Sequence, residues 1–310
     1  MQQVQHQNKI RLIKWLCRTC VCATLLSLMW GCTVAPKRLF IKDLSTSFDA
    51  ETIISTKTGE AVSFDELMAD LAGVRVIYVG EQHSDPVHHR IQLDIIKAVY
   101  QTDPDIVVGM EMFDHTYQHI LDLWSAGELD QKTFLQKVHW YANWKWNFEL
   151  YKDILEFIKQ EKIRLVGLNV PFHIPSKIAL GGIENLLDDD RKHIPPNIDT
   201  SIDAHRAYVE KIYNHHRATK MDSFDFFYEA QCAWEDTMAA SVALNMKDDR
   251  MIVIAGNGHI IRKFGIPDRT FRQTGADFRT VYPATAGNEV ESDYADYIWV
   301  TSREKPHAKK

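Results

Sequence analysis

The segment VRVIYVGEQH, residues 74–83, narrows the range of folds open to this chain. Residues 74–79 are mostly β-branched and apolar, which is typical of a strand buried on both faces of a parallel sheet. Gly80 ends the run, and Glu81 and His83 follow at once. Ligands of open α/β sheets bind beyond the carboxyl ends of the strands. The segment therefore predicts an acid and an imidazole at a ligand-binding edge.

Three later segments repeat this pattern of an apolar strand followed by polar side chains. They are residues 105–109, 163–168 and 251–255, and they lead to Glu111, to Asn169, and to Asn257 with His259. The carboxyl ends of parallel strands meet at one edge of a sheet, so all four polar sets are expected to lie together.

The segments between these strands have helical patterns, which predicts an α/β fold with a mostly parallel central sheet flanked by helices. The long helical stretches 114–160 and 199–246 are expected as insertions that form a lid over the strand carboxyl ends. Within the second stretch, Gln231 and Glu235 share one helix face, either facing a pocket or as part of a solvated stripe. The aromatic residues of 139–151 fit either core packing or the wall of a flat ligand pocket.

The first 32 residues have the layout of an exported lipoprotein signal. Basic residues precede the apolar run 21–30, which is too short to span a bilayer, and Gly31-Cys32 follows as a lipidation site. Met29 and Trp30 replace the residues preferred there, so a plain secretory signal or an uncleaved anchor remains open. The residue after Cys32 is not Asp, which favours the outer membrane over retention at the inner membrane.

The sequence after the signal predicts one domain with short flanking segments. We expect a tether over residues 33–49, a single α/β domain over 50–303 and a tail over 304–310. Within the domain, a capping box is expected at Ser63. The formal net charge of -6 offers no basic field to nucleic acid. Cys232 is the single cysteine beyond the signal and is expected as a buried core residue rather than a disulfide partner.

Six motifs in order resemble the ChaN family of bacterial haem-binding, iron-uptake-associated lipoproteins, within the Tiki and erythromycin-esterase-like superfamily. They are GEQH at 80–83, the acidic strand end at Glu111, W-x-W-x-x-x-x-Y at 144–151, N-x-P at 169–171, AQCAWEDTMA at 230–239 and GNGHI at 256–260. The resemblance implies an α/β fold and two haems stacked face to face across a dimer, with tyrosine and histidine near the iron. The core polar set of the superfamily maps onto Glu81, His83, Glu111, Glu235 and His259.

The resemblance favours a protein that sequesters or relays haem at the cell envelope, with an outer-membrane haem or iron receptor as a further partner. Its predicted haem contacts are Glu81, His83, Glu111, Tyr151, Asn169, Gln231, Glu235, Asn257 and His259. The alternative is a hydrolase in which His83, His259, Glu81 and Glu111 hold a divalent metal ion and activate water. The tryptophans of 114–160 are expected to be partly exposed in the monomer, where they would form a haem-linked homodimer interface.

Overall fold

The computed structural model describes residues 37–215, 223–246 and 249–302. The predicted signal peptide, Cys32 and the tail 304–310 lie outside the described residues. The chain divides into two units after Lys37, and every element below belongs to the unit Arg38–Lys310.

The centre of this unit is an eight-stranded sheet in the order β4-β3-β11-β9-β5-β8-β6-β7. Six of its strands are mutually parallel neighbours: β11 (Tyr297–Thr301), β9 (Phe278–Thr285), β5 (Val76–Val79), β8 (Arg250–Ile254), β6 (Ile106–Asp114) and β7 (Arg164–Asn169). The hairpin of β3 (Ile53–Ser55) and β4 (Glu60–Val62) adds an antiparallel edge. The predicted fold class is confirmed.

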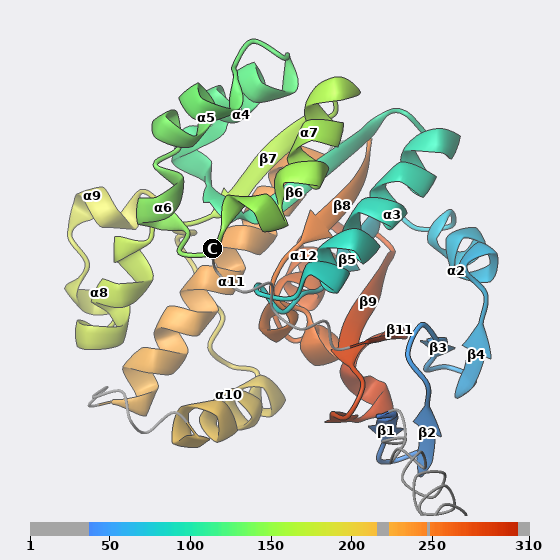
Figure 1. Ribbon diagram of the computed structural model, residues 1–310. Helices are drawn as coiled ribbons and strands as arrows, with labels where there is room; N and C mark the ends of the chain where they lie inside the picture. Colours follow the sequence, from blue (N-terminus) through green and yellow to red (C-terminus); the bar gives the residue numbers. More distant parts are fainter. Residues whose placement is uncertain (1–36, 216–222, 247–248, 303–310) are drawn as a thin grey trace, which may run out of the picture. The chain divides into compact units, whose positions relative to one another are not determined.

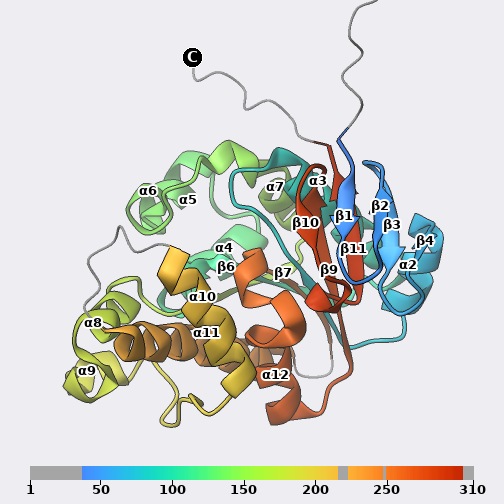
Figure 2. The ribbon, with the colours of Figure 1, turned by 90° about the horizontal axis from the view of Figure 1, so that it is seen from below.

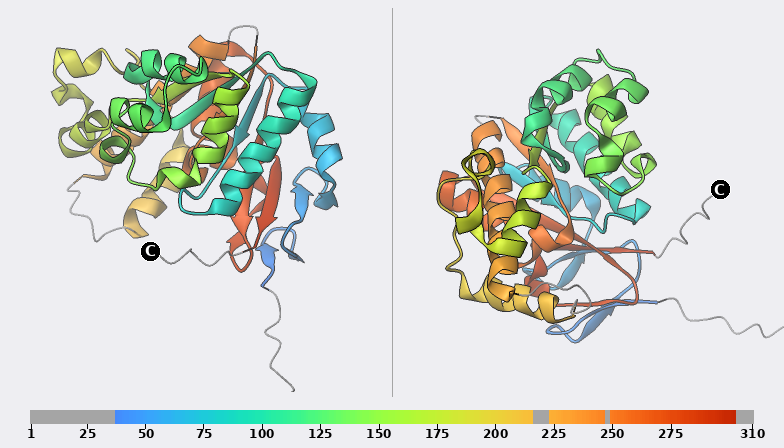
Figure 3. Two further views of the ribbon diagram at one scale, coloured as in Figure 1. Left: turned by 45° about the horizontal axis from the view of Figure 1, so that its top comes forward. Right: turned by 90° about the vertical axis from the view of Figure 1, so that its left-hand side faces the viewer.

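Helices cover both faces of the sheet, which explains why the central strands β5 and β6 are buried along their whole length (Figures 1, 2 and 3). Alternate residues of β5 point to opposite faces, so Ile77 packs in one core and Tyr78 in the other. The first core includes α3 (Pro86–Thr102) and α7 (Lys152–Gln160), and the second includes α11 (Phe224–Met246) and α12 (Ile266–Thr274).

The predicted local signals around α2 (Phe64–Leu71) are present in the structure. Ser63 accepts a hydrogen bond from the Glu66 amide while the Glu66 carboxylate accepts one from the Ser63 amide, which completes the capping box. Gly59 has a φ of 74° in the turn between β3 and β4, a conformation that glycine adopts without strain.

Strand β6 is longer than predicted. It continues through Glu111 to Asp114, and its register with β7 shifts between Met110 and Asp114. All of its side chains are buried, including the carboxylates of Glu111 and Asp114. A buried acid within a strand has the same sequence signature as a strand end, which is why the predicted strand stopped too early.

The predicted tether over residues 33–49 is wrong for the part that the structure describes. Strands β1 (Leu39–Ile41) and β2 (Thr46–Phe48) form a small sheet with β10 (Glu289–Val290). The side chains of Leu39 and Ile41 are fully buried. Strands of three residues are too short for the alternation of apolar and polar residues to be recognised in the sequence.

Two groups of helices interrupt the alternation of strand and helix, as predicted. The helices between β6 and β7 are α4 (Gln118–Ser125), α5 (Gln131–Lys137), α6 (Trp140–Asn143) and α7, and those between β7 and β8 are α8 (His173–Gly181), α9 (Asp188–Arg191), α10 (Asp203–His215) and α11. Short 3-10 turns occupy His115–Tyr117, Phe148–Leu150, Ile183–Asn185, Asn257–His259, Ile261–Lys263 and Ser292–Tyr294. Among the described helices, none has the length and hydropathy required to cross a bilayer.

The expected exposure of tryptophan in 114–160 is wrong for Trp124, Trp140 and Trp144, whereas Trp146 is partly exposed. Trp124 and Trp140 are 0% and 1% exposed, and both belong to the core that contains α3 and α7. Trp144 is buried and Trp146 is partly buried against that core. These rings are buried where the short helices of the insertion pack against one another. Helices of four to nine residues carry few apolar side chains, so the large tryptophan rings supply much of the packing surface.

Candidate functional site

The four polar sets lie together at the carboxyl ends of four adjacent strands, β5, β8, β6 and β7. The Gly256 amide after β8 donates to Glu111 Oε2 on β6 at 2.6 Å. Asn169 at the end of β7 donates through Nδ2 to the Glu111 carbonyl at 2.8 Å. His83 lies so close to Gly256 that a Cβ added there would be 2.9 Å from its Cε1 atom. Only glycine therefore fits beside the His83 ring.

A cavity of about 330 Å³ opens above these residues. His83, Glu111 and Asn169 form its floor. Its walls come from the predicted insertion 114–160, from the segment that follows β7, and from Trp234 of the predicted insertion 199–246. Trp144 and Trp146 follow α6, and Phe172 precedes α8. The cavity thus has aromatic side chains in its walls and polar side chains in its floor.

The His83 ring is held in one orientation. Its Nδ1 atom donates to Glu81 Oε1 at 2.7 Å, and the ring lies edge-on to Trp144 with 4.8 Å between the centroids. The side chain is 27% exposed. Because a carboxylate only accepts hydrogen bonds, Nδ1 carries the proton and Nε2 is the ring nitrogen that is available to a ligand.

Glu81 is 2% exposed and is satisfied by donors on every side. Its Oε1 atom also accepts from the Tyr151 hydroxyl at 2.7 Å, and its Oε2 atom accepts from Gln92 Nε2 at 2.9 Å and lies 3.2 Å from His89 Nδ1. Burial opposes ionisation, but the charge of His89 and the hydrogen bonds of both histidines outweigh it and hold the pKa of Glu81 far below its usual range. Glu81 is therefore a buried carboxylate anion.

His259 bridges two further buried carboxylates. Its Nε2 atom lies 3.6 Å from Glu111 Oε1, and its Nδ1 atom lies 3.3 Å from Glu235 Oε1. Gln231 Nε2 donates to the same Glu235 oxygen at 2.6 Å. Burial lowers the pKa of His259, but the two carboxylates, Glu111 first, raise it to about 10. His259 is thus an imidazolium cation at neutral pH.

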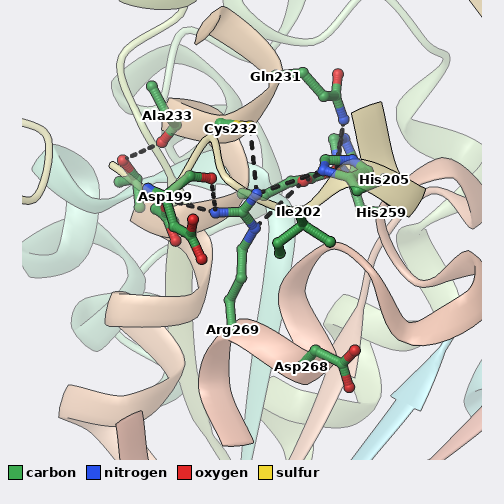
Figure 4. Close-up of polar contacts among 12 residues, drawn as sticks. Asp199, Ile202, His205, Gln231, Cys232, Ala233, His259, Asp268 and Arg269 are labelled. Atoms are coloured by element: carbon green, nitrogen blue, oxygen red, sulfur yellow. Dashed lines mark hydrogen bonds and ion pairs between the residues drawn. The ribbon is translucent and has the colours of Figure 1, made fainter. Parts of the chain in front are cut away.

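Behind His259 lies a second layer of charge centred on Arg269 of α12, which is 2% exposed (Figure 4). Its guanidinium pairs with Asp236 at 2.6 Å, donates to the Asp199 carbonyl at 3.0 Å and lies 3.5 Å from Glu235 Oε2. His205 of α10 lies 3.3 Å from the same Glu235 oxygen. This layer ties α10, α11 and α12 together beneath the floor of the cavity.

Cys232 is buried and unpaired, as expected, and accepts a hydrogen bond from Arg269 Nη2 at 3.3 Å. Burial, as the main cause, raises the pKa of its thiol to about 12. The thiol is therefore protonated at neutral pH and packs as a small core side chain.

The predicted site residues fall into three groups by position. His83, Glu111 and Asn169 line the cavity, whereas Glu81, Tyr151, Gln231, Glu235 and His259 form the hydrogen-bonded layer behind it. Asn257 faces a different cavity, of about 360 Å³, and donates to the Pro283 carbonyl at 3.0 Å. Whether these residues contact a ligand stays a prediction.

Sequence reasoning missed several residues that complete the site: His89, Gln92, Phe172, His205 and Arg269. One signal was available for the first two, because His89 and Gln92 share a face of α3, three residues apart. His88 and His89 are adjacent in the sequence and both are buried, and His88 Nδ1 accepts a hydrogen bond from the Gln82 amide at 2.8 Å.

The arrangement that a divalent metal requires is not found among the described residues. None of their His, Cys, Asp and Glu side chains forms a group of three or more placed to hold a metal ion. In the set predicted for the hydrolase alternative, both Glu81 oxygens accept hydrogen bonds from protein donors and Glu111 accepts from Gly256. These carboxylate oxygens therefore already accept hydrogen bonds from protein donors.

Comparison of the sequence with models of protein families identifies the family of the chain. The model of the haem-binding uptake family ChaN, of the Tiki superfamily, matches residues 67–270. The chain belongs to the ChaN family. This match spans all four strand ends of the site. A search of curated proteins found no match.

A solved ChaN structure shares the fold of this chain at low sequence identity. ChaN of Campylobacter jejuni, described with cofacial haem binding, is 19% identical, with a TM-score of 0.66 over 80% of this chain and 95% of that one. A mutant erythromycin esterase in its open conformation is 13% identical, with a TM-score of 0.45 over 76% of each chain. The likeness to Campylobacter ChaN establishes the fold.

Proposed function

We propose that this chain binds haem in the cavity at the strand carboxyl ends, with His83 Nε2 as the protein ligand to the iron. The observation that carries this proposal is the fixed His83 ring, whose Nδ1 atom is engaged by buried Glu81 while the ring itself lines a cavity walled by Trp144 and Trp146. Imidazole is an established axial ligand of haem iron. A carboxylate on the far nitrogen is the usual support of a metal-bound histidine.

The cavity suits the other parts of haem as well. Its aromatic walls match a flat apolar macrocycle. Lys145 and Ser176, both exposed, line its outer part and offer a cation and a hydroxyl to the carboxylates of the porphyrin. When bound, haem supplies the iron centre; the chain supplies the ligand, the apolar walls and the fixed carboxylates.

A titration of the purified protein lacking residues 1–32 tests the proposal. Haemin is expected to produce a Soret band that saturates at about one haem per chain, and metal-free protoporphyrin is expected to bind more weakly because it offers His83 no iron. The same preparation is assayed for ester and peptide hydrolysis with manganese, cobalt or zinc. Metal-dependent hydrolysis that requires His83, without a specific haemin spectrum, would transfer the assignment to the hydrolase alternative.

We further propose that the chain is exported and lipid-anchored at Cys32, at the outer membrane, where it relays haem or iron with an outer-membrane receptor as partner. The support is the basic and apolar layout of residues 1–30 followed by Gly31-Cys32. Cys32→Ala is expected to abolish palmitate labelling and to release the protein from the membrane fraction. Retention of both label and membrane residence would contradict the anchor.

A haem-linked homodimer is the last part of the proposal. A cavity of about 330 Å³ is at the small end of ligand pockets and leaves part of a macrocycle uncovered. Phe172, 66% exposed, lines the cavity, and Tyr141, 65% exposed, precedes Ala142, which also lines it; the two rings provide an apolar surface for a second copy. Haem that bridges two copies stabilises the dimer by mass action.

Sedimentation of the protein lacking residues 1–32 measures this effect. The monomer is expected to shift to a dimer as haemin approaches one equivalent per chain, and Phe172→Ser is expected to weaken the shift. A species that remains monomeric at saturating haemin would show that one chain completes the site.

A further inference from the structure

One carboxylate oxygen, Glu81 Oε1, accepts two hydrogen bonds of equal length. His83 Nδ1 and the Tyr151 hydroxyl each lie 2.7 Å from it. Glu81 and Tyr151 are 2% and 0% exposed, so water does not compete with either donor. The negative charge of this oxygen is therefore divided between a tyrosine and the histidine that faces the cavity.

The Tyr151 hydroxyl remains a donor under all ordinary conditions. Burial first, and then the charge of Glu81, raise the pKa of Tyr151 far above its usual range. Tyr151 does not line the cavity; its ring packs against His89 and Trp140, with centroids 4.4 and 5.5 Å away. The Tyr151 hydroxyl therefore acts on His83 through Glu81, while its ring also lies 6.3 Å from Trp144 of the cavity wall.

We propose that Glu81 and Tyr151 set the oxidation-state preference of haem bound at His83: Glu81 favours the ferric form, and Tyr151 limits how strongly it does so. This inference rests on the proposed function. A carboxylate that accepts a hydrogen bond from Nδ1–H makes Nε2 a more basic ligand. A more basic ligand stabilises ferric iron, which carries one more positive charge than ferrous iron, and burial strengthens the effect.

The two residues act in opposite directions on the same oxygen. A hydrogen bond to an anion withdraws electron density from the accepting oxygen. Without the Tyr151 hydroxyl, Glu81 Oε1 therefore accepts a stronger hydrogen bond from His83 Nδ1. Without the charge of Glu81, the Nδ1 proton faces a neutral acceptor. Both are positioning residues, since they act through His83.

The test is the reduction potential of the haem complex, measured by spectroelectrochemistry in the wild type and in three variants. Glu81→Gln is expected to lower the ratio of ferric to ferrous affinity about tenfold, which raises the potential by about 59 mV for one electron. Tyr151→Phe is expected to shift the potential in the opposite direction. Tyr297→Phe is the matched control. Tyr297 lies on β11, which β9 separates from β5, and its hydroxyl donates to Asp70 of α2 at 2.8 Å. No shift is expected for Tyr297→Phe.

Glu81 and Tyr151 share one hydrogen-bonded oxygen. Opposite shifts of the reduction potential in their variants indicate electronic tuning, because a loss of packing would shift the potential of both variants in the same direction. Shifts of the same sign in the two variants overturn the inference. If Glu81→Gln fails to fold, an unmoved or raised potential in Tyr151→Phe overturns it by itself. A wild-type protein that forms no haemin complex overturns the proposed function, and this inference with it. A normal haemin complex with unmoved potentials overturns the inference alone.

Discussion

Replacement of His83 by alanine is expected to weaken haemin binding at least about 100-fold, the upper end of what loss of an outer-shell partner costs a metal site. The reason is the position of the ring: Nδ1 is engaged by Glu81, and the side chain lines the cavity beside Gly256. The measurement is a Soret titration of the protein lacking residues 1–32. Added imidazole is expected to restore the spectrum by occupying the space that the side chain leaves.

His119 of α4 provides the matched control, because it is exposed and does not line the cavity. His119→Ala should bind haemin as the wild type does. If His83→Ala retains the wild-type spectrum and affinity, another side chain ligates the iron, and the exposed Tyr141 becomes the residue to replace next.

Arg269→Met is expected to lower the free energy of unfolding by about 3–5 kcal/mol, the cost of removing one partner from a buried ion pair. Arg269 neutralises Asp236 at 2.6 Å and lies 3.5 Å from Glu235 in a region that excludes water. Methionine fills much of the volume but leaves two buried carboxylates with less compensation. Urea denaturation followed by circular dichroism measures the change.

Arg272→Met on the same helix controls for the loss of a positive charge. Arg272 also pairs with a carboxylate, Asp199, at 2.6 Å, but its side chain is 46% exposed. Exposed ion pairs contribute about 0–1 kcal/mol, so this variant should unfold close to the wild type. Equal effects of the two substitutions would mean that the Arg269 network is solvated rather than buried.

The floor of the site could be predicted from sequence because its signals are local. An unbroken apolar run has few alternatives to a buried parallel strand, and Gly80 marks where that run stops. Once the strands are parallel, geometry alone brings Glu81, Glu111 and His259 to one edge.

Several residues of the layer behind the floor could be predicted, but their pairings could not, because the pairs form only in the folded chain. Tyr151 and Glu81 are 70 residues apart, and nothing local distinguishes a tyrosine that supports a carboxylate from one that packs in a core. Arg269 lies in the polar sequence DRTFRQT, which is typical of a solvated helix. It is buried because α12 packs against α11, whose Asp236 faces it.

The two parts of the cavity differ in how freely their sequences can change. Glu111 belongs to β6, which is paired on both sides with β7 and β8, whereas the walls come from the four-residue α6 and the start of α8. Changes in these wall segments leave the hydrogen-bond ladder of the sheet intact. A descendant of this chain could therefore acquire a pocket of another shape while it inherits the same buried carboxylates. During evolution, ligand specificity can thus change while the ability of the chain to fold is retained.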